Sequence, residues 1–226
     1  MPSRGNATPV FQGLRLGLPE GSVTDLTGPS GAGKSSLLMA LARLNPCAKG
    51  RMTLMGRDAS TFSPERWRAL VSYLPQQPIL LGTTVADAIR DPWSYSVRHI
   101  GNEAGWIVRM RRRLRFGRSV PDGPSNTMMR RALDGVGCSD IELDRPSRDL
   151  SGGQAARVCL CRTLLTRPRV LLCDEVDAGL DDANAAKVGE AIRAAANHGV
   201  AVLRVRHRSS DGLACRILTL KDGVLR

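Results

Sequence analysis

The chain has 226 residues, and its 33 Lys and Arg outnumber 21 Asp and Glu, for a formal net charge of +12. That length allows one α/β domain with an inserted lobe. No apolar run approaches the roughly 18 residues of a membrane span, and Met1–Thr8 lack the apolar core of a signal peptide, so we expect a soluble chain. The basic balance suits nucleic acid, an anionic membrane surface or nucleotide, and does not choose among them.

The six cysteines form no C-x-x-C pair, and Cys159, Cys161 and Cys173 lie in apolar stretches. We therefore expect reduced thiols that pack as small hydrophobic side chains, in preference to disulfides or a metal site.

In the first third of the chain, residues 1–27 are typical of two short strands around the turn Leu18–Gly21, feeding a strand at Val23–Leu26. Asn45-Pro46 ends a helix over 36–44. The pattern further predicts a strand at 51–55, a turn at 56–58, a helix starting at 63–66 with Pro at its first position, a strand at 71–74 and a loop at 75–78.

Residues 82–150 change character, because strand-like apolar runs give way to Arg and helix formers. We interpret them as a helical lobe, with helices at 83–90, 107–116 and 128–136, inserted between core segments 1–81 and 151–226. The rest predicts helices at 152–165 and 182–197, strands at 170–173 and 200–205, and a terminal hairpin of 217–220 with 224–225. Short apolar strands alternating with helices indicate an α/β fold whose mostly parallel sheet is covered on both faces.

A phosphate-binding loop stands between the strand at Val23–Leu26 and the helix that follows. Gly28–Ser35 match G-x-x-x-x-G-K-[ST], in which glycines let successive N–H groups converge on an anion at a helix N-terminus. Lys34 is expected to reach the β- and γ-phosphates, and the Ser35 hydroxyl to bind Mg²⁺. The predicted nucleotide-binding set here is Gly28, Pro29, Ser30, Gly31, Ala32, Gly33, Lys34, Ser35 and Ser36, although Ser36 also fits an ordinary helix residue.

A second motif, Leu150-Ser151-Gly152-Gly153-Gln154, stands at the start of a predicted helix. With it the chain resembles the ATP-binding cassette (ABC) ATPases, whose signature is LSGGQ, from about Val10 to Arg226. The resemblance implies the fold of P-loop NTPases with a mostly parallel core sheet, N-terminal antiparallel strands and an inserted helical lobe. It also implies ATP and Mg²⁺ as cofactors.

The resemblance assigns roles to further residues in the family's order. Gln76 would touch Mg²⁺ and the attacking water, Asp174 would hold Mg²⁺ with Ser35, and Glu175 would be the catalytic base. Asp174 also ends a buried strand, at the edge where open α/β sheets bind ligands. Ala178–Asp181 match the D-loop, and His207 matches the switch histidine at the γ-phosphate.

The resemblance also implies that two copies share each nucleotide. Ser151, Gly152, Gly153 and Gln154 would contact the γ-phosphate bound to the other subunit, and Asp181 would lie at the dimer interface. A homodimer around two ATP is the simpler expectation.

Each of these residues has a plainer interpretation when taken alone. Gln76 fits a surface loop, Asp174-Glu175 the cap of a turn, and His207 a satisfied histidine at a strand end. The ordered set favours the catalytic interpretation.

The sequence departs from the family pattern in three places, one of which is Ala156 in the signature helix, where the family frequently has Gln. Residues 1–9 contain no aromatic side chain to stack on adenine, and Phe11 better fits a strand position facing the core. Val176-Asp177 replace the frequent Pro-Thr, and Asp177 would add negative charge near the γ-phosphate. No catalytic group is lost, so we expect an active ATPase.

The compact lobe, Gly82–Asp149, and the end of the chain at the core hairpin favour the ATPase subunit of a bacterial ABC transporter, bound to a separate membrane permease. In such transporters the helical lobe and the Gln76 loop form the groove that receives the permease's coupling helix. Thr83–Trp93 are similar to small bacterial ATPases assigned to iron or metal export. The alternatives are another cargo, a soluble ABC ATPase acting on nucleic acid, and a cassette that binds ATP without hydrolysing it.

The run Arg109–Arg115 fits contact with anionic lipid or with an acidic permease loop, and fits a solvated helix face equally well. Nucleic acid is the less favoured partner, because no aromatic-interleaved platform or recognition module is present. The transporter hypothesis places the chain peripherally, at the cytoplasmic side of the bacterial inner membrane.

Overall fold

The computed structural model describes residues 10–95, 123–206 and 209–226, which divide into two units. The first unit comprises Met1–Gln76 with Arg167–Arg226, and the second comprises Gln77–Thr166. The predicted helix at 107–116 and the Arg109–Arg115 run lie outside the described residues.

Six strands of the first unit form one sheet in the order β4-β5-β6-β1-β7-β8. Every neighbouring pair is parallel except β7 with β8, so the expectation of a mostly parallel sheet is confirmed. The strands are β1 (Val23–Thr27), β4 (Val71–Leu74), β5 (Val170–Asp174), β6 (Ala201–Val205), β7 (Arg216–Lys221) and β8 (Val224–Leu225).

The strand register aligns the carboxyl ends of the three central strands. Asp174 of β5 is level with Val205 of β6, and Val205 is level with Leu26 of β1. The segments that follow these strands therefore leave the sheet at one edge, which is where open α/β sheets bind ligands.

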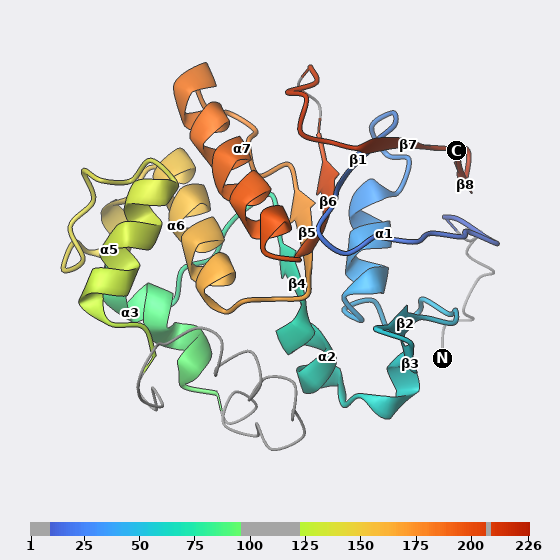
Figure 1. Ribbon diagram of the computed structural model, residues 1–226, viewed down its shortest axis with the longest axis horizontal. Helices are drawn as coiled ribbons and strands as arrows, with labels where there is room; N and C mark the ends of the chain where they lie inside the picture. The colour runs from blue at the N-terminus through green and yellow to red at the C-terminus, as the bar shows by residue number, and fades with distance from the viewer. Residues whose placement is uncertain (1–9, 96–122, 207–208) are drawn as a thin grey trace, which may run out of the picture. The chain divides into compact units, whose positions relative to one another are not determined.

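Helices cover both faces of this sheet, with α1 (Lys34–Leu41) on one side and α7 (Asp182–Asn197) on the other (Figure 1). Because strand side chains alternate between faces, Leu26 and Leu203 pack with Leu38 in the core beneath α1. All three side chains are fully buried.

Beside β4, α2 (Pro64–Leu70) has Pro at its first turn, as predicted. The Ser63 hydroxyl caps this helix by accepting from the Arg66 N–H. Trp67 is buried, and its indole N–H donates to the Leu41 carbonyl at the end of α1 over 2.8 Å. The two helices are thereby joined.

The strand predicted at 51–55 is a hairpin of β2 (Thr53–Leu54) and β3 (Arg57–Asp58), followed by a short 3-10 helix, η1 (Ala59–Thr61). Its turn residues, Met55 and Gly56, both have positive φ, 53° and 76°. Two-residue hairpin turns need this conformation, so the turn lies ahead of the predicted 56–58.

The two short strands expected ahead of β1 are not found in residues 10–22, none of which is in a strand. Glycines at 13, 17 and 21 interrupt this segment, and glycine weakens strands because it has no side chain to pack. Leu14, Leu16 and Leu18 still pack against the core of the sheet. The antiparallel strand pairs of the described residues are β2–β3 and β7–β8, and an isolated antiparallel bridge joins Thr84 to Pro146.

The second unit is helical in the residues described. It contains α3 (Val85–Arg90), η2 (Asp91–Trp93), α5 (Asn126–Gly135), η4 (Ser147–Asp149) and α6 (Gly152–Leu165). Its centre is α6, which packs against both α3 and α5. Ile89, Leu133 and Leu160, one from each helix, are buried. The unit therefore extends over 77–166, whereas the sequence analysis assigned α6 to the core and limited the lobe to 82–150.

All six cysteines are free thiols, as expected. Burial raises the pKa of Cys173 to about 12 and also raises the pKa of Cys159 above its usual value. These two thiols therefore stay protonated at neutral pH and act as packing groups.

We predict that Leu203→Ala destabilises the first unit by about 2–5 kcal/mol, because it leaves a cavity beside α1. Urea denaturation followed by circular dichroism measures the loss. Ile217→Ala is the control: this β7 side chain is 56% exposed, and its loss should cost less than about 1 kcal/mol. Equal losses in the two variants would contradict the assigned core.

Candidate functional site

The loop Gly28–Ser35 connects the end of β1 to the start of α1. Gly28 lies so close to β7 that an added Cβ would be 2.1 Å from the Leu220 carbonyl oxygen. Gly33 precedes the helix with φ 94°, in the left-handed region, and provides no side-chain cap. The first-turn N–H groups of an α-helix have no intrahelical partner, so α1 presents them at the end of the loop as an anion-binding site.

Lys34 is folded back over this loop. Its ammonium donates to the carbonyl oxygens of Gly28 and Pro29 over 2.8 and 3.0 Å, and only 6% of the residue is exposed. The positive charge is thus held where the helix N-terminus is also positive. An anion entering the loop gains from both.

Asp174 ends β5 and is 3% exposed. It is two residues after Leu172 in the strand, so both side chains point to the face covered by α1. The Tyr73 hydroxyl donates to its Oδ2 over 3.0 Å. Burial, together with the nearby Asp174 charge, raises the pKa of Tyr73, which keeps the phenol protonated as a donor. The sequence analysis missed Tyr73, whose place at the end of a strand beside β5 was the available signal.

Glu175 follows β5 in a left-handed backbone conformation, with φ 54°. This conformation is costly for a residue with a side chain. The Glu175 N–H donates to the Val205 carbonyl over 3.2 Å, which anchors it to the neighbouring strand. Its Oε2 accepts from Nε2 of Gln76 over 3.0 Å. The structure thus joins two predicted site residues that are 99 positions apart in the sequence.

Asp177 does not present a free negative charge. It is 7% exposed, and its Oδ2 accepts from Nε of Arg206 over 2.9 Å. The negative charge expected near the site is therefore balanced by an arginine that the sequence analysis did not single out.

Asp181 caps α7, since its Oδ1 accepts from the Asn184 N–H over 2.9 Å. This bond is the main cause that lowers the pKa of Asp181. The side chain is exposed and carries its charge at neutral pH.

Ser151 and Gln154 form a capping box at the start of α6, in the second unit. The Ser151 hydroxyl accepts from the Gln154 N–H over 3.2 Å, and Gln154 Oε1 accepts from the Ser151 N–H over 3.0 Å. Ser151 and Gly152 are exposed, so this helix start is open to a ligand from outside the chain.

Phe11 is not in a strand, but it packs against the core of the sheet as the sequence analysis expected. Val10 is 54% exposed and lies against the phosphate loop. The closeness is clear at Gly33, where an added Cβ would be 2.4 Å from Cγ1 of Val10.

The predicted residues thus fall into three groups. Lys34 with its loop, Gln76, Asp174, Glu175 and Asp181 belong to the first unit, and Ser151–Gln154 belong to the second. His207 lies outside the described residues. Among the residues described, no group of three or more His, Cys, Asp or Glu side chains is placed to hold a metal ion. Within the same ranges, no helix has the length and apolarity needed to cross a membrane.

Comparison with known proteins gives the family. The model of the ABC transporter family matches residues 11–178. A relative from Escherichia coli K12, the probable iron export ATP-binding protein FetA, is 32% identical over 94% of this chain and 84% of its own length. The mycobactin import ATP-binding/permease protein IrtB of Mycobacterium bovis is 31% identical over 97% of this chain, which spans 35% of that protein.

A solved structure of an ABC exporter has a similar fold. A bacterial Atm1-family ABC exporter with ATP bound superposes with a TM-score of 0.77 and 26% identity, over 99% of this chain and 36% of the exporter. The chain thus spans most of FetA but about a third of the two longer proteins. The fold, the loop and the match over 11–178 agree, and the chain belongs to the ABC transporter family, as an ATP-binding and ATP-hydrolysing domain.

Proposed function

We propose that this chain is the ATPase subunit that drives a separate membrane permease, and that two copies close around two ATP molecules. The observation that carries the proposal is the hydrogen bond between Gln76 and Glu175, beside the buried Asp174. It joins the ends of β4 and β5 at the edge where a ligand of an α/β sheet binds. A carboxylate and an amide held 3.0 Å apart can orient one water molecule between them and a phosphate.

The phosphate loop supplies the binding energy. The N-terminus of α1 and the Lys34 ammonium would attract the β- and γ-phosphates, and Lys34 would exchange its carbonyl partners for phosphate oxygens. Val10 beside Gly33 offers an apolar surface to the nucleoside in place of an aromatic side chain. Phosphoryl transfer needs positioning and charge stabilisation above all, and these residues supply both.

The donor set of the first unit fits Mg²⁺. The buried Asp174 carboxylate and the exposed Ser35 hydroxyl are hard oxygen ligands, and Gln76 offers an amide oxygen. When bound, Mg²⁺ neutralises charge that develops on the transferred phosphate. Tyr73 would fix the orientation of Asp174 in readiness.

The open start of α6 would complete the site of the second copy. Ser151 and Gly152 are exposed at this helix start, and the positive end of the helix dipole suits a γ-phosphate bound to another subunit. Asp181, exposed at the start of α7, is proposed to lie at the interface between the copies. His207 would sense the γ-phosphate, by its resemblance to the switch histidine.

The permease is proposed to dock on the second unit. Just after Gln76, Ile79 and Leu81 are 69% and 52% exposed, although both side chains are large and apolar. The guanidinium of Arg162 on α6 donates to the Ile79 carbonyl over 3.2 Å and so fixes the backbone there. Exposed apolar residues on a fixed backbone suit the insertion of a partner's helix.

For the cargo we propose iron or another metal, moved outward, as the name of FetA states for that relative. IrtB is named as an importer, so the ATPase domain alone does not determine direction. Docking would hold the chain at the cytoplasmic face of the inner membrane, with Arg109–Arg115 beside anionic lipid.

We predict that Glu175→Gln abolishes ATP turnover but keeps ATP binding, and that it accumulates an ATP-bound dimer. The amide keeps the shape of the side chain but cannot accept a proton from water. Phosphate release and light scattering after size exclusion with Mg-ATP measure the two effects. Lys34→Ala/Glu175→Gln is the control, which should stay monomeric because it lacks the phosphate-binding ammonium. Native turnover in Glu175→Gln would overturn the proposed role.

We predict that Ile79→Asp prevents recovery of the permease. Tagged Glu175→Gln protein, incubated with detergent-solubilised membranes and Mg-ATP, should retain a multi-span membrane protein identified by mass spectrometry. Adding Ile79→Asp should remove it, because a buried charge opposes docking. Ile217→Asp, a change at an apolar residue of the first unit that is 56% exposed, should not. Recovery of nucleic acid or soluble factors instead would favour the soluble alternative.

A further inference from the structure

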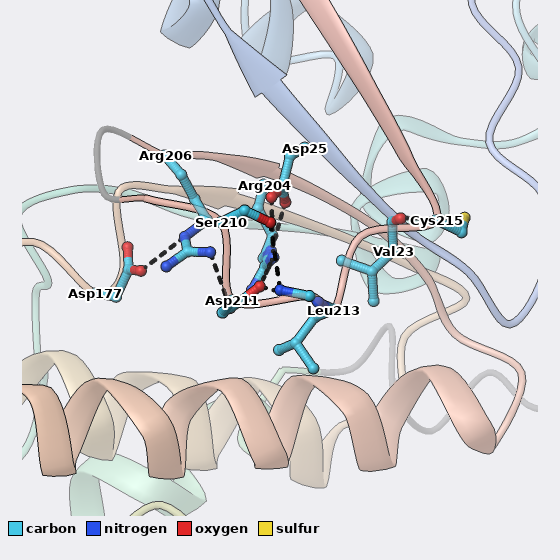
Figure 2. A network of polar contacts seen from close by, with 10 residues as sticks. Val23, Asp25, Asp177, Arg204, Arg206, Ser210, Asp211, Leu213 and Cys215 are labelled. Atoms are coloured by element: carbon cyan, nitrogen blue, oxygen red, sulfur yellow. Dashed lines mark hydrogen bonds and ion pairs between the residues drawn. The ribbon is translucent and has the colours of Figure 1, made fainter.

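Five charged side chains form one network beneath α7, on the sheet face opposite α1 (Figure 2). They come from β1, from the loop after β5, from the end of β6 and from the loop before β7. Gly189 of α7 leaves room for this last loop, because an added Cβ would lie 3.0 Å from the Leu213 side chain. The network consists of Asp25, Asp177, Arg204, Arg206 and Asp211.

Asp211 stands at the centre and binds both arginines. Its Oδ2 lies 3.0 Å from Nη1 of Arg204 and 2.9 Å from Nη1 of Arg206. Burial alone would raise the pKa of Asp211, but hydrogen bonds from Arg204 and from the Leu213 N–H hold it below its usual value. Asp211 is therefore ionised at neutral pH.

The two outer carboxylates each pair with one arginine, Asp25 through two hydrogen bonds and Asp177 through one. Asp25 accepts from Nε and Nη2 of Arg204 over 2.8 and 3.1 Å, and Asp177 accepts from Nε of Arg206 over 2.9 Å. Their side chains are 7% and 10% exposed. Removing either one leaves its arginine paired with Asp211.

Buried ion pairs contribute little net stability, because desolvation of the charges offsets their attraction. Breaking one partner of such a pair is nevertheless costly, so the geometry of the groups is held firmly. A network of this kind is therefore suited to fixing the position of the segments that carry it.

The segment that most needs fixing follows Glu175. The strained Glu175 is anchored by its N–H on Val205, the last residue of β6, and Arg206, which follows β6, binds Asp177. The end of β6 and the residue after it thus contact the loop that follows β5 at two points. One contact is a backbone hydrogen bond and the other is an ion pair. The Ala178 N–H also donates to the Glu175 carbonyl over 3.0 Å, which closes a turn over residues 175–178.

We propose that Asp177 and Arg206 are positioning residues for ATP hydrolysis, which hold Glu175 in its left-handed conformation against Gln76. The inference rests on the proposed role of Glu175 as catalytic base. We expect this ion pair to affect the rate of turnover and not the affinity for nucleotide, since neither side chain belongs to the phosphate loop.

The test compares Asp177→Ala with its matched control, Asp25→Ala, in the purified chain. Both variants should lower the melting temperature, and Asp25→Ala at least as much as Asp177→Ala, because it loses two hydrogen bonds and not one. Only Asp177→Ala should lower kcat, by about tenfold, with the KM and the Kd for ATP within about twofold of native. Asp177→Asn keeps an oxygen acceptor for Arg206, and its kcat should fall only about threefold.

Native kcat in a folded Asp177→Ala would overturn the proposal, and so would an equal loss of kcat in Asp25→Ala. If Asp177→Ala does not fold, the test passes to Asp177→Asn, and unchanged kcat in that variant is the contradicting result. Glu175→Gln is measured alongside. If it retains turnover, the proposed catalytic base is wrong, whereas an inactive Glu175→Gln beside a fully active Asp177→Ala rejects the positioning role alone.

Discussion

The parallel register of β5, β6 and β1 is the constraint on which the site depends. It sets Asp174, Val205 and Leu26 level with one another, so the segments that follow them emerge at one edge of the sheet. The phosphate loop, Glu175 and the residues ahead of His207 all begin there. A change of register in β6 would move the Val205 carbonyl that anchors Glu175 and the guanidinium that anchors Asp177. The positions of the site residues at this edge therefore depend on the register in which the strands pair.

Local sequence patterns predicted much of the fold. Apolar strand runs and capping residues determine structure over a few positions, so β4, β5, α6 and α7 were located closely. The strand prediction for residues 10–22 was wrong, because the alternating leucines of this segment pack on the core without pairing as a strand. The compact second unit has wider bounds than the predicted lobe for a related reason: helix periodicity predicts α6, but only tertiary packing places it with α3 and α5.

The candidate site divides in the same way. The loop glycines, Lys34 and Asp174 belong to motifs whose residue types carry the chemistry directly. Tyr73, Arg206 and Asp211 belong to no motif, and their significance arises only when the fold brings each of them to a distant polar or charged partner. Asp177 shows the limit most clearly, because its charge was visible in the sequence and its partner, 29 positions away, was not. Long-range electrostatics thus changed the meaning of a correctly identified residue.

The central claim, that each nucleotide site joins the loop of one copy to the α6 start of another, is tested most directly by mixing two inactive variants. Lys34→Ala removes the loop's ammonium, and Gly152→Asp places a carboxylate at the helix start, where an added Cβ meets no atom within 4 Å. A mixed dimer contains one intact composite site, so an equimolar mixture should recover up to about a quarter of native ATP turnover. A mixture as inactive as its components would contradict sites shared between copies.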